Sequence, residues 1–584
     1  MKRLLKYLSA YKKECILGPL FKLLEASFEL IVPLVIAQIV DHGIKDKDTD
    51  KILWMSLILL LLAAVGLASS ITAQYFAAKA ATGFAAKVRA ALFSHIETFS
   101  FQEMDEMGTS TLITRMTSDV NQVQSGVNMV LRLFLRSPFI VFGAMIMAFS
   151  VNVKAAMVFV VTIPLLTIVV FGVMIASIPL FRKVQKGLDD ILGKTRENLA
   201  GVRVIRAFHK EEEEKQQFEQ SNRFLTNMQI VVGRISAMTN PLTYIIINFS
   251  IIAVVWIGAR QVYAGIIPQG MVLALVSYMS QILVELVKLA NLIVNVTKSL
   301  ACAGRIADVL DISASVQDPK TNQPQYPVGK EEPYITFSHV NMRYEGGSED
   351  ALSDIDFAVE KGQTIGIIGG TGSGKTTLVH LLPRFYDVAE GSLRIAGKDV
   401  RDYPLEELRD KIGIVMQKAV LFSGSIAQNL RWGKADATEE EMWKALEVAQ
   451  AVDVVKEKED GLEYHIEEGG KNLSGGQKQR LTIARAIVKD PEILILDDSA
   501  SALDFATDAN LRKALKENMK QKTVFLVSQR TSSIQHADKI LVLDDGHIAG
   551  FDTHKNLLET CEIYREIYDS QFKKEQNPKE GMTE

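Results

Sequence analysis

A run of glycines that ends in Lys375 and Thr376 has the residue types that bind phosphate groups. The run, Gly369–Thr376, reads GGTGSGKT; it follows an apolar strand predicted at Thr364–Ile368 and precedes the helical sequence TLVHLL. Glycines let the backbone fold tightly enough to point its N–H groups at phosphate oxygens where a helix begins. Lys375 would neutralise β- and γ-phosphate charge, and Thr376 would place a hydroxyl on Mg²⁺. The pattern predicts a nucleotide-binding loop.

A second buried strand, predicted at Ile493–Leu496, ends in the carboxylate of Asp497. A carboxylate at the C-terminal end of a strand beside a phosphate loop is placed to ligate Mg²⁺. Between the two strands lies LSGGQ, Leu473–Gln477, followed by the helical sequence KQRLTIARAIV. A small hydroxyl and two glycines at a helix N-terminus favour a second anion site. The domain thus has two phosphate-binding devices, one more than a single ATP needs.

The composition limits the kinds of protein that could carry these motifs. The 584 residues include 65 Lys+Arg and 69 Asp+Glu, a formal charge of −4, which argues against a protein that neutralises nucleic-acid phosphates. The three cysteines, Cys15, Cys302 and Cys561, are widely separated and odd in number, which excludes a disulfide framework and a CxxC metal cluster. The length leaves room for several domains, each with a core of its own.

The chain up to about residue 311 is dominated by apolar runs. A helix needs about 20 apolar residues to cross the hydrocarbon core of a bilayer, and several runs reach that length with few charges. We expect six spans. They are Ile16–Val40, Ile52–Phe76, Val130–Phe149, Ala155–Phe181, Leu242–Ile257 and Met271–Val296. The alternative, buried helices of a large soluble protein, fits poorly because residues 52–67 read ILWMSLILLLLAAVGL.

The charges of the connections predict the orientation. The long connections at Ala77–Gln124 and Arg182–Asn240 are rich in Lys and Arg, whereas those at Val151–Lys154 and Tyr263–Gly270 are very short. By the positive-inside rule, the long connections and both termini face the cytosol. The chain begins MKRLLKYLSAYKKE, which suits a short amphipathic helix on the inner leaflet better than a cleaved secretory signal.

The first span contains the carboxylates Glu25 and Glu29, and the last span contains Glu285 and Lys288. Charges at such depth usually face a polar cavity or one another. Glu285 and Lys288 are three residues apart, so an intrahelical pair and a substrate contact are both open interpretations.

The composition changes after Gly304. We expect a membrane domain at 1–312 and a linker at 313–333, where four prolines occur among Asn and Gln. Alternating strand and helix patterns then predict an α/β nucleotide-binding domain at 334–573. The polar end of the chain, 574–584, is expected to be a flexible tail.

Taken together, the motifs resemble those of the ATP-binding cassette (ABC) family, and the resemblance covers the whole chain. The matching segments are Gly369–Thr376, Gln417, LSGGQ at Leu473–Gln477, the strand that ends at Asp497, and Ser501–Asp504. The resemblance implies an α-helical membrane domain with six transmembrane helices, of the exporter type, fused to an α/β P-loop domain that binds ATP and Mg²⁺. It also implies that two cassettes meet head to tail, so that the LSGGQ of one closes over ATP held by the other.

The resemblance also gives individual residues expected roles. Tyr344 would stack on adenine, with packing as the alternative. Thr376, Gln417 and Asp497 would hold Mg²⁺. The residues expected to bind nucleotide are Tyr344, Gly369, Gly370, Thr371, Gly372, Ser373, Gly374, Lys375, Thr376, Thr377, Gln417, Ser474, Gly475, Gly476 and Gln477.

The same resemblance implies contacts between cassettes and spans. Glu468 would contact the membrane extensions of the other half. Helical turns near Gly108–Asp119 and near Phe208–Phe218 would be the coupling helices that lie on the cassettes.

Two residues depart from the family pattern. Asp498 follows Asp497 where the family carries a glutamate that polarises the attacking water, and Gln529 occupies the position of a histidine that contacts the γ-phosphate. Aspartate is shorter by one methylene, about 1.5 Å, and a displacement of about 1 Å can lower a rate about 10²-fold. An amide keeps some hydrogen bonding but loses the imidazole's shape and possible charge. We therefore expect a site that binds ATP but hydrolyses it slowly.

These departures favour a heterodimer in which a second half-transporter carries the consensus Glu and His, while this chain lends it an intact LSGGQ. The leading function is ATP-driven efflux of amphipathic small molecules of the multidrug type. Export of a lipid or a peptide, a homodimer, and a mainly regulatory ATP-binding subunit are the alternatives. We expect a multi-pass protein of a bacterial inner membrane, with no nucleic-acid partner. The sequence has no feature that identifies the substrate or the partner.

Overall fold

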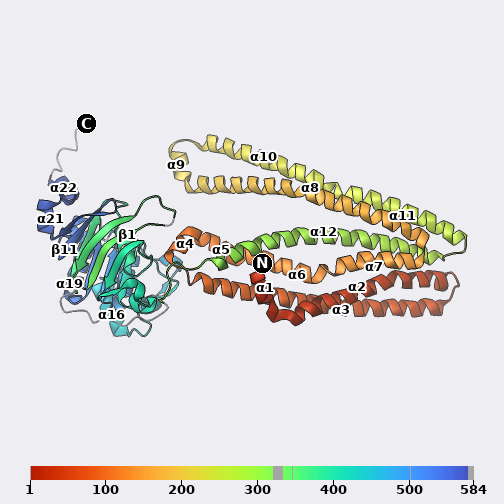
Figure 1. Cartoon of the computed structure of the whole chain (residues 1–584), viewed down its shortest axis with the longest axis horizontal. Coiled ribbons are helices and arrows are strands. Elements are labelled where there is room, and N and C mark those ends of the chain that lie inside the picture. Colours follow the sequence, from red (N-terminus) through yellow and green to blue (C-terminus); the bar gives the residue numbers. More distant parts are fainter. Residues whose placement is uncertain (1, 320–332, 345, 500, 577–584) are drawn as a thin grey trace. The chain divides into compact units, whose positions relative to one another are not determined.

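The computed structural model describes residues 2–319, 333–344, 346–499 and 501–576. They divide into two compact units, drawn in Figure 1. The membrane unit combines Met1–Glu97 with Ser110–Ile312, and the cassette unit combines Thr98–Thr109 with Ser313–Glu584. The short segment Thr98–Thr109 therefore belongs to the cassette unit, although it lies between two spans in the sequence.

Long helices make up the membrane unit. Its six candidate spans are Leu4–Ile44, Thr49–Ile96, Thr109–Val151, Val153–Ala200, Glu211–Tyr263 and Gln269–Asp311. At a rise of about 1.5 Å per residue, a helix of 48 residues is about 72 Å long, more than twice the hydrocarbon core of a bilayer. The prediction of six membrane-spanning helices is confirmed.

Within these spans the helices are α1 (Lys2–Leu8), α2 (Lys12–Gln38), α3 (Thr49–Ile96), α5 (Thr109–Thr114), α6 (Val120–Leu133), α7 (Arg136–Val151), α8 (Val153–Ala200), α10 (Glu211–Ala237), α11 (Thr239–Tyr263) and α12 (Gln269–Asp311). The short helix α9 (Val202–Ala207) joins α8 to α10, which run side by side in Figure 1. Small residues such as Ala73 and Ala77 of α3 are fully buried, whereas Leu53 and Leu60 of the same helix are 72% and 69% exposed. Small residues let helices approach closely, and the exposed leucines suit contact with lipid.

The ionisable side chains of the spans are bonded to one another. The guanidinium of Arg136 on α7 donates from Nη1 to Glu285 Oε1 on α12 and from Nη2 to Glu29 Oε2 on α2, each over 2.6 Å. Glu285 also accepts from Lys288 Nζ at 2.8 Å and from the hydroxyl of Ser137 at 2.8 Å. Of the two interpretations left open for Glu285 and Lys288, the intrahelical pair is present, within a network whose central cation no sequence pattern singles out. Separately, Lys22 donates to Glu25 over 2.5 Å.

The cassette unit contains two main sheets. A four-stranded antiparallel sheet has the order β2-β1-β4-β5, and a six-stranded sheet has the order β12-β11-β3-β10-β9-β6. Five strands of the larger sheet are parallel and β12 is antiparallel to β11. The strands are β1 (Ile335–Met342), β2 (Leu352–Val359), β3 (Thr364–Gly369), β4 (Glu390–Ile395), β5 (Lys398–Asp399), β6 (Ile412–Val415), β9 (Ile493–Asp497), β10 (Thr523–Val527), β11 (Lys539–Asp544) and β12 (His547–Asp552), and a separate pair is formed by β7 (Gly424–Ser425) and β8 (His465–Ile466). The predicted α/β class is confirmed.

Helices cover the larger sheet and build a helical part beside it. They are α13 (Lys375–Leu381), α14 (Leu405–Asp410), α15 (Ile426–Arg431), α16 (Glu439–Val448), α17 (Val452–Lys456), α18 (Gly475–Val488), α19 (Phe505–Asn518), α20 (Thr531–Ile534), α21 (His554–Thr560) and α22 (Glu562–Gln576). One apolar core lies between the two sheets around Phe337, Phe357 and Phe525, and a second fills the helical part around Leu446 and Leu481. The parallel strands are almost fully buried, which explains their continuous apolar sequences.

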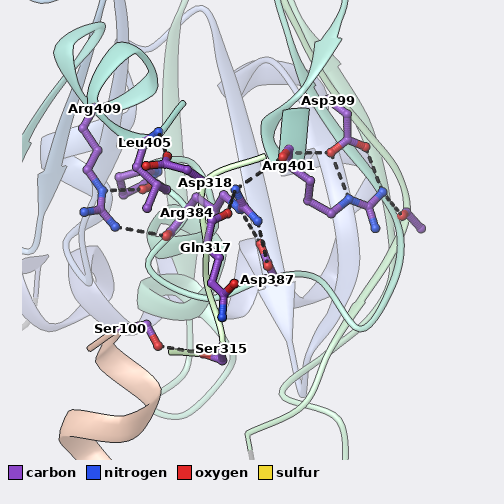
Figure 2. Close-up of polar contacts among 12 residues, drawn as sticks. Ser100, Ser315, Gln317, Asp318, Arg384, Asp387, Asp399, Arg401, Leu405 and Arg409 are labelled. Atoms are coloured by element: carbon purple, nitrogen blue, oxygen red, sulfur yellow. Dashed lines mark hydrogen bonds and ion pairs between the residues drawn. The ribbon is translucent and has the colours of Figure 1, made fainter. Parts of the chain in front are cut away.

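The segment that follows α12 lies on the cassette, as Figure 2 shows. Arg384 Nη1 donates to the carbonyl of Gln317 at 3.1 Å, and the Leu405 N–H donates to Asp318 Oδ1 at 2.7 Å. The first residues of the expected linker are thus held in place. Residues 320–332 of that linker and 577–584 of the expected tail lie outside the described residues. Helix α22 runs to Gln576 and so includes the first three residues of the expected tail, 574–576.

Candidate functional site

The phosphate loop connects β3 to α13 at the carboxyl edge of the parallel strands. Strand β3 lies between β10 and β11 in the sheet. Gly372 and Gly374 have φ of 85° and 93°, and a Cβ on Gly374 would lie 2.7 Å from a methyl carbon of Leu352. Glycine at both positions is therefore required by the turn. The loop borders a cavity of about 370 Å³. The cavity is lined by Tyr344, Ala351, Thr371, Gly372, Gly374, Lys375, Thr376, Thr377, Gln417, Asp497, Asp498, Val527, Ser528 and Gln529.

The ammonium group of Lys375 is held by backbone oxygens. Its Nζ donates to the carbonyls of Gly369 at 3.0 Å and Gly370 at 2.5 Å. Burial lowers the pKa of Lys375, and the charges of Asp498 and Asp497 partly offset this effect. Neutral carbonyls compensate a buried cation less fully than a carboxylate does, so the ammonium remains available for phosphate oxygens.

Asp497 ends β9 with its side chain only 1% exposed. Its Oδ1 accepts from the Thr376 hydroxyl at 3.2 Å, and its Oδ2 has no hydrogen-bond partner among the described residues. Burial raises the pKa of Asp497 to about 6, and the hydroxyl of Thr376 partly offsets this. A hydroxyl beside a buried carboxylate with a free oxygen fits a Mg²⁺ site, because hard oxygen ligands suit that ion. Gln417 lines the same cavity.

Asp498 stands directly after the strand in the left-handed region, with φ of 44°. Its Oδ2 accepts from Gln417 Nε2 at 3.4 Å. Burial raises the pKa of Asp498, an effect that the hydrogen bond from Gln417 partly offsets. The carboxylate therefore lies at the cavity, bonded to the amide that neighbours it.

Gln529 follows β10 and also lines the cavity. Its backbone carbonyl accepts from Gln571 Nε2 at 2.7 Å. Gln571 belongs to the C-terminal helix α22 and is 42 residues from Gln529 in the sequence, so no local motif predicts this bond.

Tyr344 lies at the mouth of the cavity and is 37% exposed. Its hydroxyl is 3.0 Å from Thr377 Oγ1, and its ring meets Tyr386 edge to face, with centroids 5.2 Å apart. The ring thus has both a packing contact and exposed surface on which a base could stack.

The LSGGQ sequence begins α18 and does not line the phosphate-loop cavity. Ser474 and Gln477 cap the helix reciprocally: Ser474 Oγ accepts from the Gln477 N–H at 3.3 Å, and Gln477 Oε1 accepts from the Ser474 N–H at 3.0 Å. Ser474 and Gly475 are exposed. Of the residues expected to bind nucleotide, the structure brings together those of the phosphate loop, Tyr344 and Gln417, but not those of LSGGQ.

Comparison with known proteins identifies the family. The family model described as ABC transporter transmembrane region matches residues 15–286, and the one described as ABC transporter matches residues 352–501. An uncharacterized ABC transporter ATP-binding protein of Mycobacterium tuberculosis is 36% identical over 569 residues, 97% of each chain. This chain belongs to the ABC transporter family.

Other relatives of this ABC transporter bear names that state a function. A putative multidrug export ATP-binding/permease protein of Bacillus subtilis is 32% identical over 578 residues, 97% of this chain and 98% of the relative. An ATP-dependent lipid A-core flippase of Hahella chejuensis is 30% identical over 524 residues, 89% of this chain and 88% of the relative. A solved bacterial Atm1-family ABC exporter with ATP bound shares the fold, with a TM-score of 0.78 over 97% of this chain and 99% of that one, at 22% identity.

The short helix of this ABC transporter that contacts the cassette is α4 (Phe101–Met107), not the expected segment Gly108–Asp119. The ring of Phe101 stacks on Phe385 with centroids 4.2 Å apart, and Tyr386 donates its hydroxyl to Asp105 at 2.6 Å. Gly108, with φ of 71°, ends α4. Residues 110–119 then belong to the membrane unit, where they form α5 after its first residue and a π-helical turn.

At the second expected segment, α9 ends directly before Phe208, and Phe208–Phe218 comprises the following turn and the start of α10. The contact of this segment with a cassette stays a prediction. Glu468, the residue expected to contact the other half, lies in the short turn Glu468–Gly470 and is exposed.

Proposed function

We propose that this ABC exporter chain is one half of a heterodimer that expels amphipathic small molecules and contributes a slow ATP site. The observation that carries the proposal is the cavity itself: the groups that bind nucleotide are complete, whereas Asp498 and Gln529 stand where a longer carboxylate and an imidazole would act. A site that binds ATP with a complete set of groups but has Asp498 and Gln529 at these two positions is expected to hold ATP and hydrolyse it slowly.

The residues have separable roles in this proposal. The loop N–H groups and Lys375 bind the phosphates, and Tyr344 stacks on the base. Thr376, Asp497 and Gln417 would hold Mg²⁺, which when bound neutralises phosphate charge. The Asp498 carboxylate is too short to orient the attacking water closely, and Gln529 offers an amide to the γ-phosphate.

The second cassette completes both sites. At the exposed start of α18 the Ser474 N–H is already bonded to Gln477, so the helix N–H offered to ATP on the other chain is that of the exposed Gly475. ATP binding would close the two cassettes, and α4 would carry that closure toward the spans. The slow site would bias the pair toward contact while hydrolysis at the competent site resets it, since ATP stabilises the closed state by its differential affinity.

The proposal also covers the exported molecule, the membrane in which the chain lies and the boundaries of its domains. The relative named for multidrug export supports amphipathic small molecules, and the relative named as a flippase keeps lipid as a second cargo. We place the chain in a bacterial inner membrane with the cassette and both termini in the cytosol. Residues 1–312 would form the transporting domain and 334–573 the cassette.

The test compares ATP hydrolysis by the full chain alone and with the half-transporter that co-purifies from the native host. The double variant Asp498→Glu/Gln529→His should raise turnover at this site by about 10- to 10²-fold, because it restores a base of full reach. Asp498→Asn, the matched control, should leave turnover of the complex nearly unchanged. Brisk hydrolysis by the unmodified chain alone, lost in Asp498→Asn, would contradict the proposal.

A further inference from the structure

One side chain of the C-terminal helix α22 forms hydrogen bonds with the loop that carries Gln529. Gln571 of α22 donates from Nε2 to the carbonyl of Gln529 at 2.7 Å. Its Oε1 accepts from the backbone N–H of Thr531 at 2.8 Å and from the Thr531 hydroxyl at 2.5 Å. The amide thus bonds the backbone on both sides of Arg530. Its donor and acceptor have different partners, so they can be altered separately.

Helix α22 is itself packed against the cassette through a buried residue. Tyr564, two helical turns before Gln571 on the same face, is fully buried and its hydroxyl is 2.7 Å from His554 Nδ1. Tyr564 belongs to an apolar cluster that includes Ile368, the residue before the phosphate loop, and Ile534 of α20. A helix anchored on the strand that leads into the phosphate loop gives Gln571 a fixed position relative to that loop.

The other end of the Gln529 loop is tied to the same strand. The Ser528 N–H donates to the carbonyl of Ile367 at 3.1 Å, and the Ser528 hydroxyl accepts from the Arg530 N–H at 3.0 Å. Gln529 itself is exposed, and its side chain has no hydrogen bond to a described residue. Its placement in the cavity therefore depends on the backbone bonds that flank it, and Gln571 supplies those on the C-terminal side.

We infer that Gln571 is a positioning residue: through the carbonyl of Gln529 and the N–H of Thr531, it holds the Gln529 side chain where the γ-phosphate of ATP would lie. The inference rests on the proposed role of Gln529 at that phosphate. It gives the C-terminal helix, which lies beyond the family match at 352–501, a part in distinguishing ATP from ADP.

The test uses the full-length chain purified by itself, which carries only its own phosphate loop. Fluorescent MANT-ATP and MANT-ADP are titrated in Mg²⁺, and amide hydrogen exchange is followed over residues 528–532 in the nucleotide-free protein. Gln571→Leu should speed exchange of this loop about tenfold and weaken MANT-ATP binding about fivefold, because the loop loses bonds on one side. MANT-ADP, which has no γ-phosphate, should bind as to the wild type.

Two further variants separate the two ends of the amide and exclude a general loosening of the helix. Gln571→Glu keeps an acceptor for Thr531 but no donor for Gln529, so exchange should stay slow at Thr531 while MANT-ATP binding still weakens. Ser570→Ala is the matched control, since Ser570 is exposed and its hydroxyl bonds only to its own helix, at the carbonyl of Ile567. It should change neither measurement.

Gln529→Ala distinguishes failure of this inference from failure of the proposed site. If Gln529→Ala weakens MANT-ATP selectively and Gln571→Leu does not, the positioning role is wrong and the proposed function stands. If neither variant alters the preference for ATP over ADP, the role of Gln529 and the inference both fail. Equal weakening of both nucleotides in Gln571→Leu, or unchanged exchange of the loop, would also overturn the inference.

Discussion

In the membrane unit, the guanidinium of Arg136 is bonded to two carboxylates, whereas in the cassette the carboxylate of Asp497 keeps one oxygen without a partner among the described residues. Both groups are almost completely buried. The two groups nevertheless differ in how their charges are paired. In the spans, anions and cations from three helices bond one another through both terminal nitrogens of Arg136, although its Nε has no hydrogen-bond partner among the described residues. In the cassette, Lys375 bonds carbonyl oxygens and Asp497 shares a single hydroxyl.

The contrast separates a structural role from a ligand-binding one. A buried charge that is paired with opposite charges of the same fold costs much to unpair and has little left to offer a ligand. A buried charge that is not satisfied costs stability until a ligand of opposite charge arrives. We therefore expect variants of the first region to change folding and those of the second to change nucleotide binding, and the predictions at Arg136, Lys375 and Asp497 test that division.

The largest effect is expected at Arg136. Arg136→Leu leaves Glu285 buried with only Lys288 and Ser137 and removes the partner of Glu29, so it should destabilise the membrane unit by about 3–5 kcal/mol. Thermal unfolding of the detergent-solubilised full chain measures this loss. ATP affinity of the protein that remains folded should be unchanged. The double variant Arg136→Leu/Glu285→Leu should recover most of the lost stability, because it removes the uncompensated charge. A double variant as unstable as the single one would mean that packing, not charge, explains the loss.

The second effect is expected at Lys375. Lys375→Ala removes a cation that faces the phosphates, so ATP affinity should fall about 100-fold, equivalent to about 2.7 kcal/mol. The melting temperature of the nucleotide-free chain should stay close to that of the wild type, since only bonds to two carbonyls and to the Ser373 hydroxyl are lost. Titration of labelled ATP measures the affinity. Strong destabilisation of the nucleotide-free chain would show that Lys375 is structural, as Arg136 is, and would break the comparison.

The same contrast explains what could be predicted from the sequence. In the cassette, Lys375 and Thr376 adjoin glycines whose turn is a local property, and Asp497 ends a strand whose apolar run marks its place, so short motifs sufficed. In the spans, Glu285 and its partner Arg136 are 149 residues apart, and only packing of α7 on α12 brings them together. The sequence shows that such charges need partners, but the partners depend on the tertiary fold.

Two other features were not predicted, for different reasons. Gln571 meets Gln529 because Tyr564 anchors α22 on a strand that is distant in the sequence, which no local pattern shows. Helix α4 begins at a capping box of Ser100 and Glu103, which is local, but the expected segment was taken from the family resemblance rather than from that signal. The resemblance located the connection correctly but not the turn that docks.

A third prediction concerns His380 of α13, whose Nε2 has no hydrogen-bond partner among the described residues. Burial lowers the pKa of His380 to about 4, partly offset by the charge of Asp105. Because the unfolded chain has a pKa near 6.5, it binds more protons than the folded one between pH 6.5 and 4, so stability is lost as the pH falls through this range. Going from pH 7 to pH 5, the wild type should lose about 2 kcal/mol more than His380→Asn, measured by thermal unfolding. Equal losses in the two proteins would mean that His380 is not held neutral by burial.

The smallest effect, and the one that most directly tests the contrast, is expected at Asp497. Asp497→Asn removes an incompletely paired buried charge, so the nucleotide-free chain in EDTA at pH 7.5 should become more stable by on the order of 1 kcal/mol. With Mg²⁺ and saturating ATP the order should reverse, because only the wild type has the anionic oxygen that the metal requires and a bound ligand stabilises the folded state. Thermal unfolding under the two conditions measures both signs. Glu285→Gln, which breaks a network of paired charges, should be less stable than the wild type under both. If Asp497→Asn also lost stability in EDTA, Asp497 would be a structural carboxylate, and the division between paired and unpaired charges would not separate fold from function in this chain.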